Sequence, residues 1–447
     1  MSIRVLIITP GDVGQRMSAP GIRAFHMAQA LAQALPHARI TLAAPKVDTR
    51  LQGFPEMVEP YSYRDRPLLW AAQDADVVVA NFLPVRLAPL CTHKLVVVDL
   101  FAQYFAEWME VTVHQEQGLT RHLIWLERRA YIAFQLAVAD LVLCANERQR
   151  LSYLGALRAL GLRRPVAVAP HGLRPQAPQK RRQVVKGVHP GIRPTDKLLI
   201  WNGGTTDWYD PDTFLMALHH LAQERDDIKA LFLGATYPNV PTLGWGRRFR
   251  SAIETAKQLG LYGSTVFFEF GWVPYDEVPD YLLEADAGVC AYSDHLETYY
   301  SFRTRFMDLL WAGLPIICTK GDTLAELIEQ EGLGFAVPPG DPIAMAHAIR
   351  SLLDDQEGQE RIRKRIQQVR QRLTWEQAMT PLIDFCRTAC PPARPRYSRL
   401  WGEVFPWALN YLATRILREL ARGEAPWLAR APQRVASRLA RIMTKEP

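Results

Sequence analysis

Two series of short apolar segments, separated by longer helical patterns, run through this sequence of 447 residues. The first series consists of Arg4–Thr9, Ala38–Ala44, Asp76–Ala80, Lys94–Asp99, Leu141–Ala145 and Val166–Ala169. The second consists of Leu198–Trp201, Lys229–Gly234, Thr265–Phe270, Ala287–Ala291, Pro315–Thr319 and Gly334–Val337. Short strands that alternate with helices are typical of βαβ units and a parallel sheet. The sequence therefore predicts an α/β fold with two consecutive, doubly wound, Rossmann-like domains.

The length of the chain also favours two domains, because one hydrophobic core usually stops growing at about 250–300 residues. We place an N-terminal domain at residues 1–173 and a second domain at residues 196–385. The basic, proline-containing residues 174–195 are interpreted as a linker, and residues 386–447 as a basic helical extension. Both domains are expected to face a shared cleft with the carboxyl ends of their strands, where doubly wound sheets bind ligands.

The sequence gives no sign of a secreted or membrane-spanning protein. Its first apolar run is too short for a signal peptide, and no stretch approaches the roughly 18–20 apolar residues that span a bilayer. The six cysteines are scattered and lie mostly in apolar runs, as reduced thiols do. We therefore expect a cytoplasmic protein.

Each domain has a glycine-containing loop after its first strand. The loop of the first domain leads into a helix whose N–H groups are expected to face the cleft, and its candidate residues are Gly11, Gly14, Gly21 and Arg23. Its spacing is not that of a dinucleotide fingerprint, and a tight turn without a ligand explains it equally well. Asp99 and His26 are further polar candidates on this side, although a structural role explains each at least as well.

In the second domain, Gly203 and Gly204 permit a diphosphate to approach the backbone closely. The nearby Asp210-Pro211-Asp212 resembles a metal-binding pair of acids. Asp210 is, however, a natural helix N-cap, and Asp212 complements the helix dipole. We therefore expect no metal and no cofactor.

The segment from Glu297 to Asp308 places two acids and two arginines at the start of a helix that leads directly into a buried strand. Arginine is a fork-shaped partner for phosphate oxygens, which suits Arg303 and Arg305. A carboxylate accepts hydrogen bonds from sugar or ribose hydroxyls. The alternative is a set of surface ion pairs one helical turn apart.

This segment continues into Gly313-Leu314-Pro315 and resembles an element of the retaining GT-B glycosyltransferases of family 4, the glycosyl transferases group 1. That element reads acid, seven residues, acid, followed by a small-residue turn. The alignment puts Asp308 at the second acid and Tyr300 at the first, so that Glu297 is the nearest substitute. The segment Gly271-Trp272-Val273-Pro274 looks like the base-binding loop of that family, and the resemblance covers roughly residues 1–385.

The resemblance implies a GT-B glycosyltransferase that moves a sugar from a nucleotide diphosphate carrier to a glycan or lipid-linked acceptor of cell-surface polysaccharide synthesis, with retention. The catalytic residues implied are Glu297, Arg303 and Asp308. The donor-binding residues implied are Gly203, Gly204, Trp272, Val273, Arg303, Thr304, Arg305, Asp308 and Lys320. The phosphate-clamping Arg and Lys usual in the family are absent after the first strand of the second domain, and Arg303, Arg305 and Lys320 are expected to replace their charge. The first-domain loop with Gly11, Gly14, Gly21, Arg23 and Asp99 is then the acceptor side.

Other functions fit the same architecture. A sugar-nucleotide epimerase or a phosphorylase would share it, and so would a non-catalytic protein that binds sugar nucleotides. Measurement of donor breakdown with and without an acceptor distinguishes the enzymes.

The C-terminal extension carries the whole net charge of +7, because residues 394–447 contain eleven Lys and Arg and four Glu. Two amphipathic patterns occur there, at Phe405, Leu409, Leu412, Ile416 and Leu420 and at Leu428, Ala431, Val435, Leu439 and Ile442. Such basic amphipathic helices are suited to an anionic membrane surface. The alternative is that both apolar faces pack on the first domain. Nucleic acid is not expected, because aromatic residues are not interleaved with the arginines.

Overall fold

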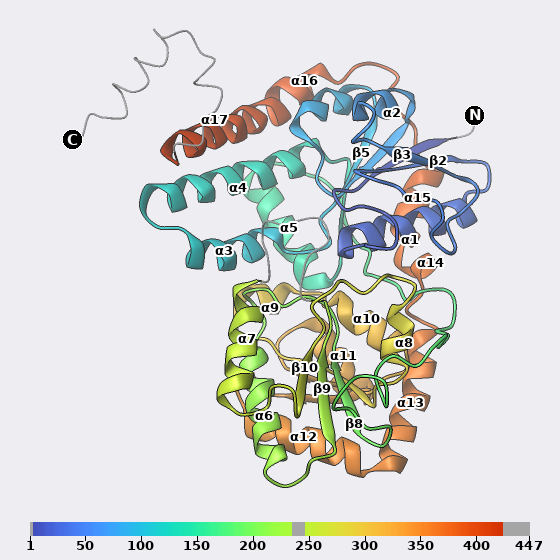
Figure 1. The fold of residues 1–447 in the computed structure, drawn as a ribbon. Coiled ribbons are helices and arrows are strands. Elements are labelled where there is room, and N and C mark those ends of the chain that lie inside the picture. Colours follow the sequence, from blue (N-terminus) through green and yellow to red (C-terminus); the bar gives the residue numbers. More distant parts are fainter. Residues whose placement is uncertain (1–2, 235–245, 423–447) are drawn as a thin grey trace.

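The computed structural model describes residues 3–234 and 246–422 and contains two α/β domains, one above the other in Figure 1. The first domain has a seven-stranded parallel sheet with the strand order β3-β2-β1-β4-β5-β6-β7. Its strands are β1 Arg4–Ile8, β2 Arg39–Ala44, β3 Val58–Ser62, β4 Val77–Ala80, β5 Leu95–Asp99, β6 Leu141–Cys144 and β7 Val166–Val168.

The second domain has a six-stranded parallel sheet with the strand order β10-β9-β8-β11-β12-β13. Its strands are β8 Lys197–Trp201, β9 Ile228–Phe232, β10 Val266–Phe268, β11 Ala287–Cys290, β12 Ile316–Thr319 and β13 Gly334–Val337. In both sheets the strand order reverses beside the first strand, as in doubly wound folds. The predicted fold class is confirmed, and each predicted strand is present.

Strand β3 is absent from the sequence-based prediction. Its residues Val58-Glu59-Pro60-Tyr61-Ser62 contain a proline, and only Val58 and Tyr61 among them are buried. A proline cannot donate to a sheet and is tolerated at an edge strand, which is where β3 lies. The apolar periodicity of an edge strand is weak, and for this reason the pattern was not recognised.

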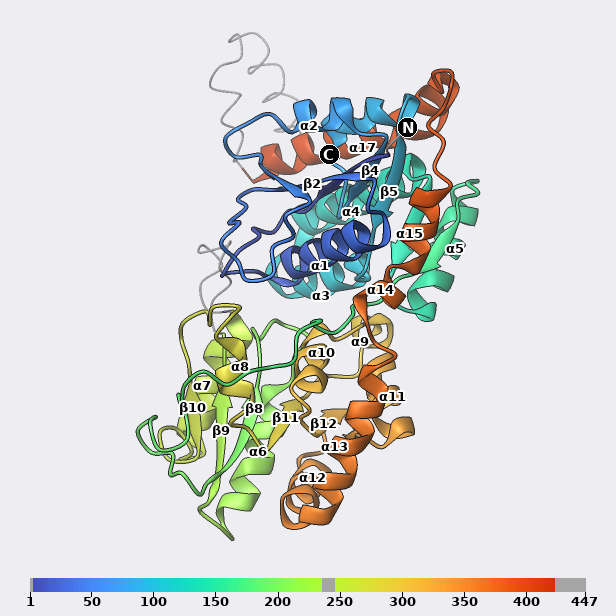
Figure 2. The same cartoon turned by 90° about the vertical axis from the view of Figure 1, so that its right-hand side faces the viewer.

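Helices cover both faces of each sheet (Figures 1 and 2). In the first domain these are α1 Ala19–Ala34, α2 Leu68–Asp74, the 3-10 helix η1 Val85–Thr92, α3 Tyr104–Gln115, α4 Gly118–Val138 and α5 Glu147–Ala159. In the second domain they are α6 Pro211–Ala222, α7 Arg247–Gln258, α8 Val278–Leu282, α9 Leu296–Tyr300, α10 Thr304–Trp311, α11 Thr323–Glu331, α12 Pro342–Asp354 and α13 Gln356–Arg370. Alternate residues of β1 enter the two cores of the first domain, with Val5 and Ile7 on one face and Leu6 on the other.

After α13 the chain returns to the first domain, whereas the sequence-based division keeps residues up to 385 in the second. Helices α14 Trp375–Ala378 and α15 Thr380–Arg387 lie in the core of the first domain. The two crossings of the chain run side by side, because Leu173 N donates to Leu373 O at 2.7 Å. The helical period of this stretch identifies the helices but not the sheet that their apolar faces contact.

The extension continues through α16 Tyr397–Arg399, the π-helical segment η3 Leu400–Val404 and α17 Phe405–Ala421. Helix α17 lies along α4 on the outside of the first domain (Figure 1). The second amphipathic pattern, from Leu428 to Ile442, lies outside the described residues. Within residues 3–234 and 246–422, each helix is too short or too polar to span a bilayer.

Candidate active-site cleft

A cleft with a volume of about 440 Å³ lies between the two domains. Its walls come from loops at the carboxyl ends of strands, which is the place where doubly wound sheets bind ligands. The first domain contributes Met17–Pro20 after β1, and the second contributes Asn202–Gly204 after β8. The segment Ser301–Arg305, at the start of α10, closes the same cavity.

The turn after β8 brings a cation against the backbone of two glycines. Gly203 has φ of +94°, in the left-handed region that favours glycine. The Arg305 guanidinium donates from Nη2 to Gly204 O at 2.6 Å and lies 4.0 Å from the centre of the Tyr209 ring. A Cβ atom at Gly203 would lie 3.6 Å from Arg305 Nη2. A phosphate at this turn would therefore meet both N–H groups and a guanidinium.

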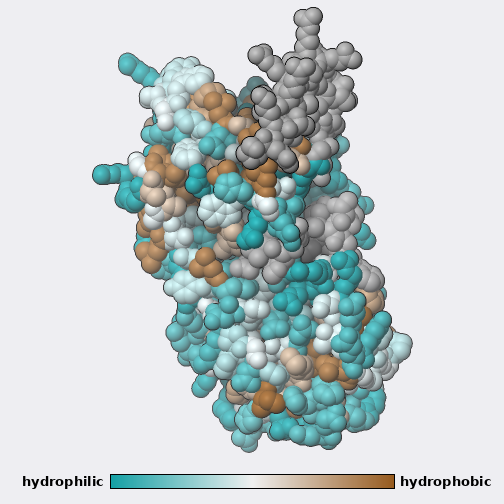
Figure 3. All heavy atoms as spheres, turned by 90° about the vertical axis from the view of Figure 1, so that its left-hand side faces the viewer, coloured by the Kyte–Doolittle hydropathy of each residue, from teal (hydrophilic) through white to brown (hydrophobic). Residues whose placement is uncertain are grey.

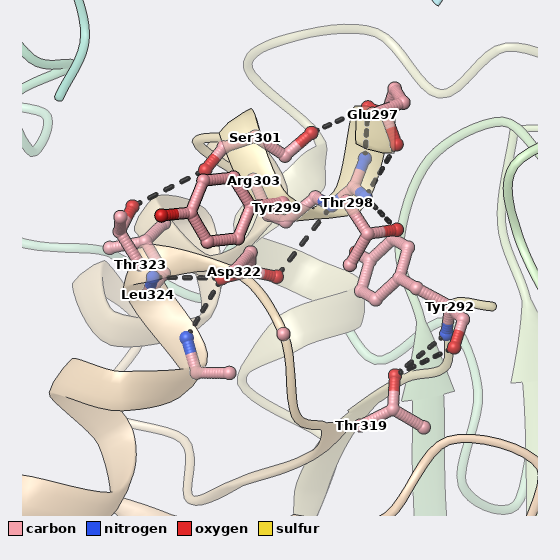
Figure 4. A network of polar contacts seen from close by, with 12 residues as sticks. Tyr292, Glu297, Thr298, Tyr299, Ser301, Arg303, Thr319, Asp322, Thr323 and Leu324 are labelled. Atoms are coloured by element: carbon pink, nitrogen blue, oxygen red, sulfur yellow. Dashed lines mark hydrogen bonds and ion pairs between the residues drawn. The ribbon is translucent and has the colours of Figure 1, made fainter. Parts of the chain in front are cut away.

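Arg303 lies two residues earlier but is bound by protein groups on several sides (Figure 4). Its two Nη atoms donate to the two carboxylate oxygens of Glu297 at 2.7 and 2.8 Å. Its Nε lies 3.6 Å from Oδ2 of Asp322, and the guanidinium stacks 3.9 Å from the centre of the Tyr292 ring. Burial raises the pKa of Asp322 to about 6, and Arg303 opposes that effect. The charge of Arg303 is thus balanced before any ligand binds.

Asp308 lines the cleft together with Arg174, which the sequence analysis assigned to the linker. Arg174 Nη2 lies 3.1 Å from Asp308 Oδ1. Its guanidinium also stacks between aromatic rings, 3.8 Å from the centre of Tyr275 and 4.6 Å from that of Trp311. Nothing in the local sequence marks Arg174, because its partners come from distant parts of the second domain.

Two buried histidines lie at the end of the cleft near the domain crossings. His26 Nε2 is 2.7 Å from Tyr275 Oη, and Nδ1 is 2.6 Å from Gln29 Oε1. Burial lowers the pKa of His26 to about 3. Burial also lowers the pKa of His171, which packs between Phe101 and Trp375. Both rings are therefore neutral at physiological pH.

Glu107, on α3, is a cleft residue that the sequence analysis missed. Burial raises the pKa of its carboxyl group to about 8, and the neighbouring Glu297 adds to this rise while Arg303 opposes it. A signal was present in the sequence, since Glu107 stands in the largely apolar run Tyr104-Phe-Ala-Glu-Trp-Met. An acid in such a run is either paired or placed at a cavity.

Most of the predicted donor-side residues meet in the cleft, namely Gly203, Gly204, Trp272, Val273, Glu297, Arg303, Thr304, Arg305 and Asp308. Lys320 does not line it, and its Nζ pairs with Glu329 Oε1 at 2.7 Å on the surface. A lysine at the end of a strand has a long, flexible side chain and pairs with an acid within its reach. The sequence pattern does not show which acid that is.

The predicted acceptor-side residues lie behind the cleft wall and do not line it. Arg23 and Asp99 form a buried ion pair through two hydrogen bonds of 2.7 and 2.8 Å, and Arg23 also donates to Ala169 O at 2.8 Å. Gly21 packs so closely that an added Cβ would lie 2.3 Å from Asp12 O. These residues, with Gly11 and Gly14, shape the loop, and its neighbours Met17–Pro20 and Ile22 form the wall.

Asp210 and Asp212 lie at the N-terminus of α6, where Asp210 is the predicted N-cap residue and Asp212 is in the first turn. Asp210 is the N-cap residue, and its Oδ1 accepts a hydrogen bond from Thr213 N at 3.2 Å. Asp212 Oδ1 accepts a hydrogen bond from the Thr255 hydroxyl at 2.9 Å. Across the described residues, His, Cys, Asp and Glu form no group of three or more that fits a metal ion.

The family model described as glycosyl transferases group 1 matches residues 188–369, which include the Gly203 turn, Arg305 and Asp308. Residues 188–369 are thus similar to the glycosyl transferases group 1. The match covers the donor-side wall of the cleft but not the first domain. No curated protein matches the chain.

Solved structures with the same two-domain architecture extend the likeness to both domains of this chain. WaaG, a glycosyltransferase involved in lipopolysaccharide biosynthesis, is 15% identical with a TM-score of 0.61, and the match covers 86% of this chain and 100% of WaaG. Sucrose-phosphate synthase from Thermosynechococcus elongatus is 15% identical with a TM-score of 0.59, covering 86% and 98%. Anabaena HepE in complex with UDP-glucose is 15% identical with a TM-score of 0.59, covering 87% and 100%. The fold of this chain is therefore GT-B.

Proposed function

We propose that this protein transfers a sugar from a nucleotide diphosphate sugar to a glycan or a lipid-linked acceptor, with retention, as the resemblance to family 4 implies. The observation that carries the proposal is the Arg305 guanidinium against the Gly203–Gly204 turn. Two further points support it. The match to the family model spans this turn, and the structural neighbour HepE is bound to UDP-glucose.

The donor diphosphate binds at the Gly203 turn, beside Arg305 and the N-terminus of α10. Negative charge develops on the diphosphate as the bond to the sugar breaks. Fixed N–H groups, a helix N-terminus and a guanidinium stabilise that charge without reorganisation. These groups supply the positive charge themselves, so that the proposed reaction proceeds without a metal ion.

The acceptor binds against the first-domain wall formed by Met17–Pro20. Tyr209 and Trp208 line the opposite side of the same cavity. Approach of the two domains brings an acceptor hydroxyl to the anomeric carbon of the sugar and excludes water, which would otherwise hydrolyse the donor.

We also propose that the extension places the enzyme at an anionic membrane surface, beside a lipid-linked acceptor of cell-surface polysaccharide synthesis. The support comes from the outer face of α17 and η3, where six large apolar side chains are exposed: Trp401, Phe405, Leu409, Leu412, Ile416 and Leu417. On the face of the molecule seen in Figure 3, apolar side chains are more frequent on the first domain than on the second. An exposed apolar helix face of this kind suits an interfacial membrane contact.

The direct test is incubation of the purified protein with nucleotide sugars of uridine, guanosine and adenosine, with and without an extract of acceptors. Transfer of label to the extract, at equal rates in EDTA and in magnesium, is the expected result. Equal breakdown with and without acceptor would indicate an epimerase or a hydrolytic enzyme instead. Activity lost in EDTA and restored by manganese would contradict the metal-free mechanism.

A further inference from the structure

Glu107 presents a carboxyl group to the cleft from the first domain. It lines the cavity on α3 and has no hydrogen-bond or ion-pair partner among the side chains that the structure describes. A buried or half-buried carboxyl group without a partner carries a desolvation cost, and such groups concentrate at functional sites.

Glu297 is the other acid in this part of the cleft, but its carboxylate oxygens are not free to bind a ligand. Its side chain is 1% exposed, and Arg303 occupies both of its oxygens. The Ser301 hydroxyl also donates to Glu297 Oε1 (Figure 4). Glu297 therefore holds the segment between α9 and α10 in place, and a hydroxyl group of a ligand would have to displace protein partners to reach it.

The position of Glu107 relative to the second domain indicates which part of a ligand it meets. Helix α3 contacts α9 across the domain boundary, and the charges of Glu297 and Arg303 both act on Glu107. Arg303 precedes the α10 N-terminus, where the diphosphate is proposed to bind. A sugar attached to that diphosphate is thus the part of the ligand nearest to Glu107.

We propose that the Glu107 carboxyl group binds a hydroxyl of the transferred sugar from the first-domain side of the cleft. This assignment rests on the proposed function and adds a residue that determines sugar specificity. Because the phosphate site and Glu107 belong to different domains, the sugar is held correctly only when the two domains are together.

The protonation state of Glu107 fits this role. With a pKa of about 8 the carboxyl group is neutral at physiological pH, so it donates one hydrogen bond and accepts another. The charged groups that act on the pKa of Glu107 are Glu297 and Arg303 from the second domain. In the first domain, burial raises the pKa of Tyr104 and Tyr153, and Glu107 itself adds to that rise. On the packed helix α4, Arg128 stacks on Trp108, the residue after Glu107. A neutral acid also avoids repulsion from the donor diphosphate.

Calorimetry with two pairs of probes, UDP with UDP-glucose and GDP with GDP-mannose, tests the assignment. For the pair that binds, Glu107→Ala should weaken binding of the nucleotide sugar by about 3- to 10-fold and leave that of the nucleoside diphosphate unchanged. Glu107→Gln keeps a donor and an acceptor and should stay within about twofold of the wild type. Glu254→Ala, an exposed glutamate on α7, is the control.

The pH dependence gives a second readout. Wild-type affinity for the nucleotide sugar should fall as the pH rises through about 8, whereas that of Glu107→Gln should stay flat. Unchanged sugar affinity in Glu107→Ala, or an equal loss for the diphosphate, would overturn the assignment. A change confined to the KM for the acceptor would overturn it as well. A wild-type protein that binds neither pair, nor ADP with ADP-glucose, would refute the proposed function, a result distinct from these.

Discussion

At the scale of single residues, Arg303 and Arg305 show how two similar side chains in one segment take different roles. Arg303 is 5% exposed and is held by Glu297 and Asp322. Arg305 lies at the glycine turn, where its Nη2 contacts a backbone carbonyl. A guanidinium that is already paired with two carboxylates gains little from a phosphate, whereas one beside exposed N–H groups adds to a phosphate site.

Substitution of the two arginines should therefore have different effects. Arg305→Ala should weaken nucleoside diphosphate binding by about 1.5–3 kcal/mol, a value typical of a charge-assisted hydrogen bond, with little change in stability. Arg303→Ala leaves Glu297 buried without its partner and should cost about 3–5 kcal/mol of stability. Calorimetry and urea unfolding measure the two quantities. Similar nucleotide affinities in Arg305→Ala and the wild type would contradict the phosphate role.

At the scale of elements, the C-terminal extension has one face in the core and one face outside it. Arg396 and Arg399 both contact Asp140 Oδ1, at 2.7 and 2.5 Å, and Arg399 also donates to the last carbonyls of α4. Val404, Ala408 and Leu420 are buried against the first domain. Four of the five residues in the predicted apolar stripe face outward, namely Phe405, Leu409, Leu412 and Ile416. The fifth, Leu420, is buried. Packing on the first domain is thus realised for one face of this helix, and the outward face is the one to which the membrane proposal applies.

This division means that truncation is a poor test of membrane binding, because it would also remove core contacts. Substitution of the outer face is better: Leu409→Glu with Ile416→Glu should abolish flotation with phosphatidylglycerol vesicles without unfolding the protein. Leu151→Glu, an equally exposed leucine on α5, should have no effect. Wild-type binding should weaken with salt, since exposed charges are screened over about 8 Å at physiological ionic strength. A wild-type protein that floats with neither acidic nor neutral vesicles would contradict the membrane proposal.

At the scale of the whole molecule, the cleft depends on contacts that join the two domains at two places. The start of α5 contacts the α9 region, where Asn146 Nδ2 donates to Tyr300 O at 2.9 Å. On the other side, Tyr275 N donates to Gln15 O at 2.8 Å, and His26 contacts the Tyr275 hydroxyl. These contacts hold the two domains in the arrangement that forms the cleft.

Because His26 is buried in its neutral form at this second contact between the domains, the stability of the protein should fall at acid pH. The unfolded chain binds a proton at His26 near pH 6.5, whereas the folded protein resists protonation down to a pKa of about 3. Stability is therefore fully present above pH 6.5 and is lost as the pH falls. At pH 5.5 the cost at this one residue is about 1.4 kcal/mol. In urea unfolding, His26→Gln should lose less stability between pH 7.5 and 5.5 than the wild type, and an equal loss would contradict this account.

Features of this protein that depend on local pattern could be predicted from the amino-acid sequence. Apolar runs of strand length identified both parallel sheets, because strands buried on both faces are continuously apolar. The Gly203 turn was recognised because it follows a buried strand at the edge where ligands bind. Arg305 was recognised as a fork-shaped partner for phosphate, and Asp308 from the resemblance of its segment to the family element. The N-cap role of Asp210 was likewise predictable, since capping involves residues three positions apart.

The tertiary structure alone decided which residues become partners across long distances in the chain. It paired Arg174 with Asp308 and Arg23 with Asp99. It also brought Glu107 into the cleft and returned α14 and α15 to the first domain. Periodicity shows that a helix has an apolar face but not which surface that face meets. A long charged side chain pairs with the nearest opposite charge in space, and the packing of the two domains sets that distance.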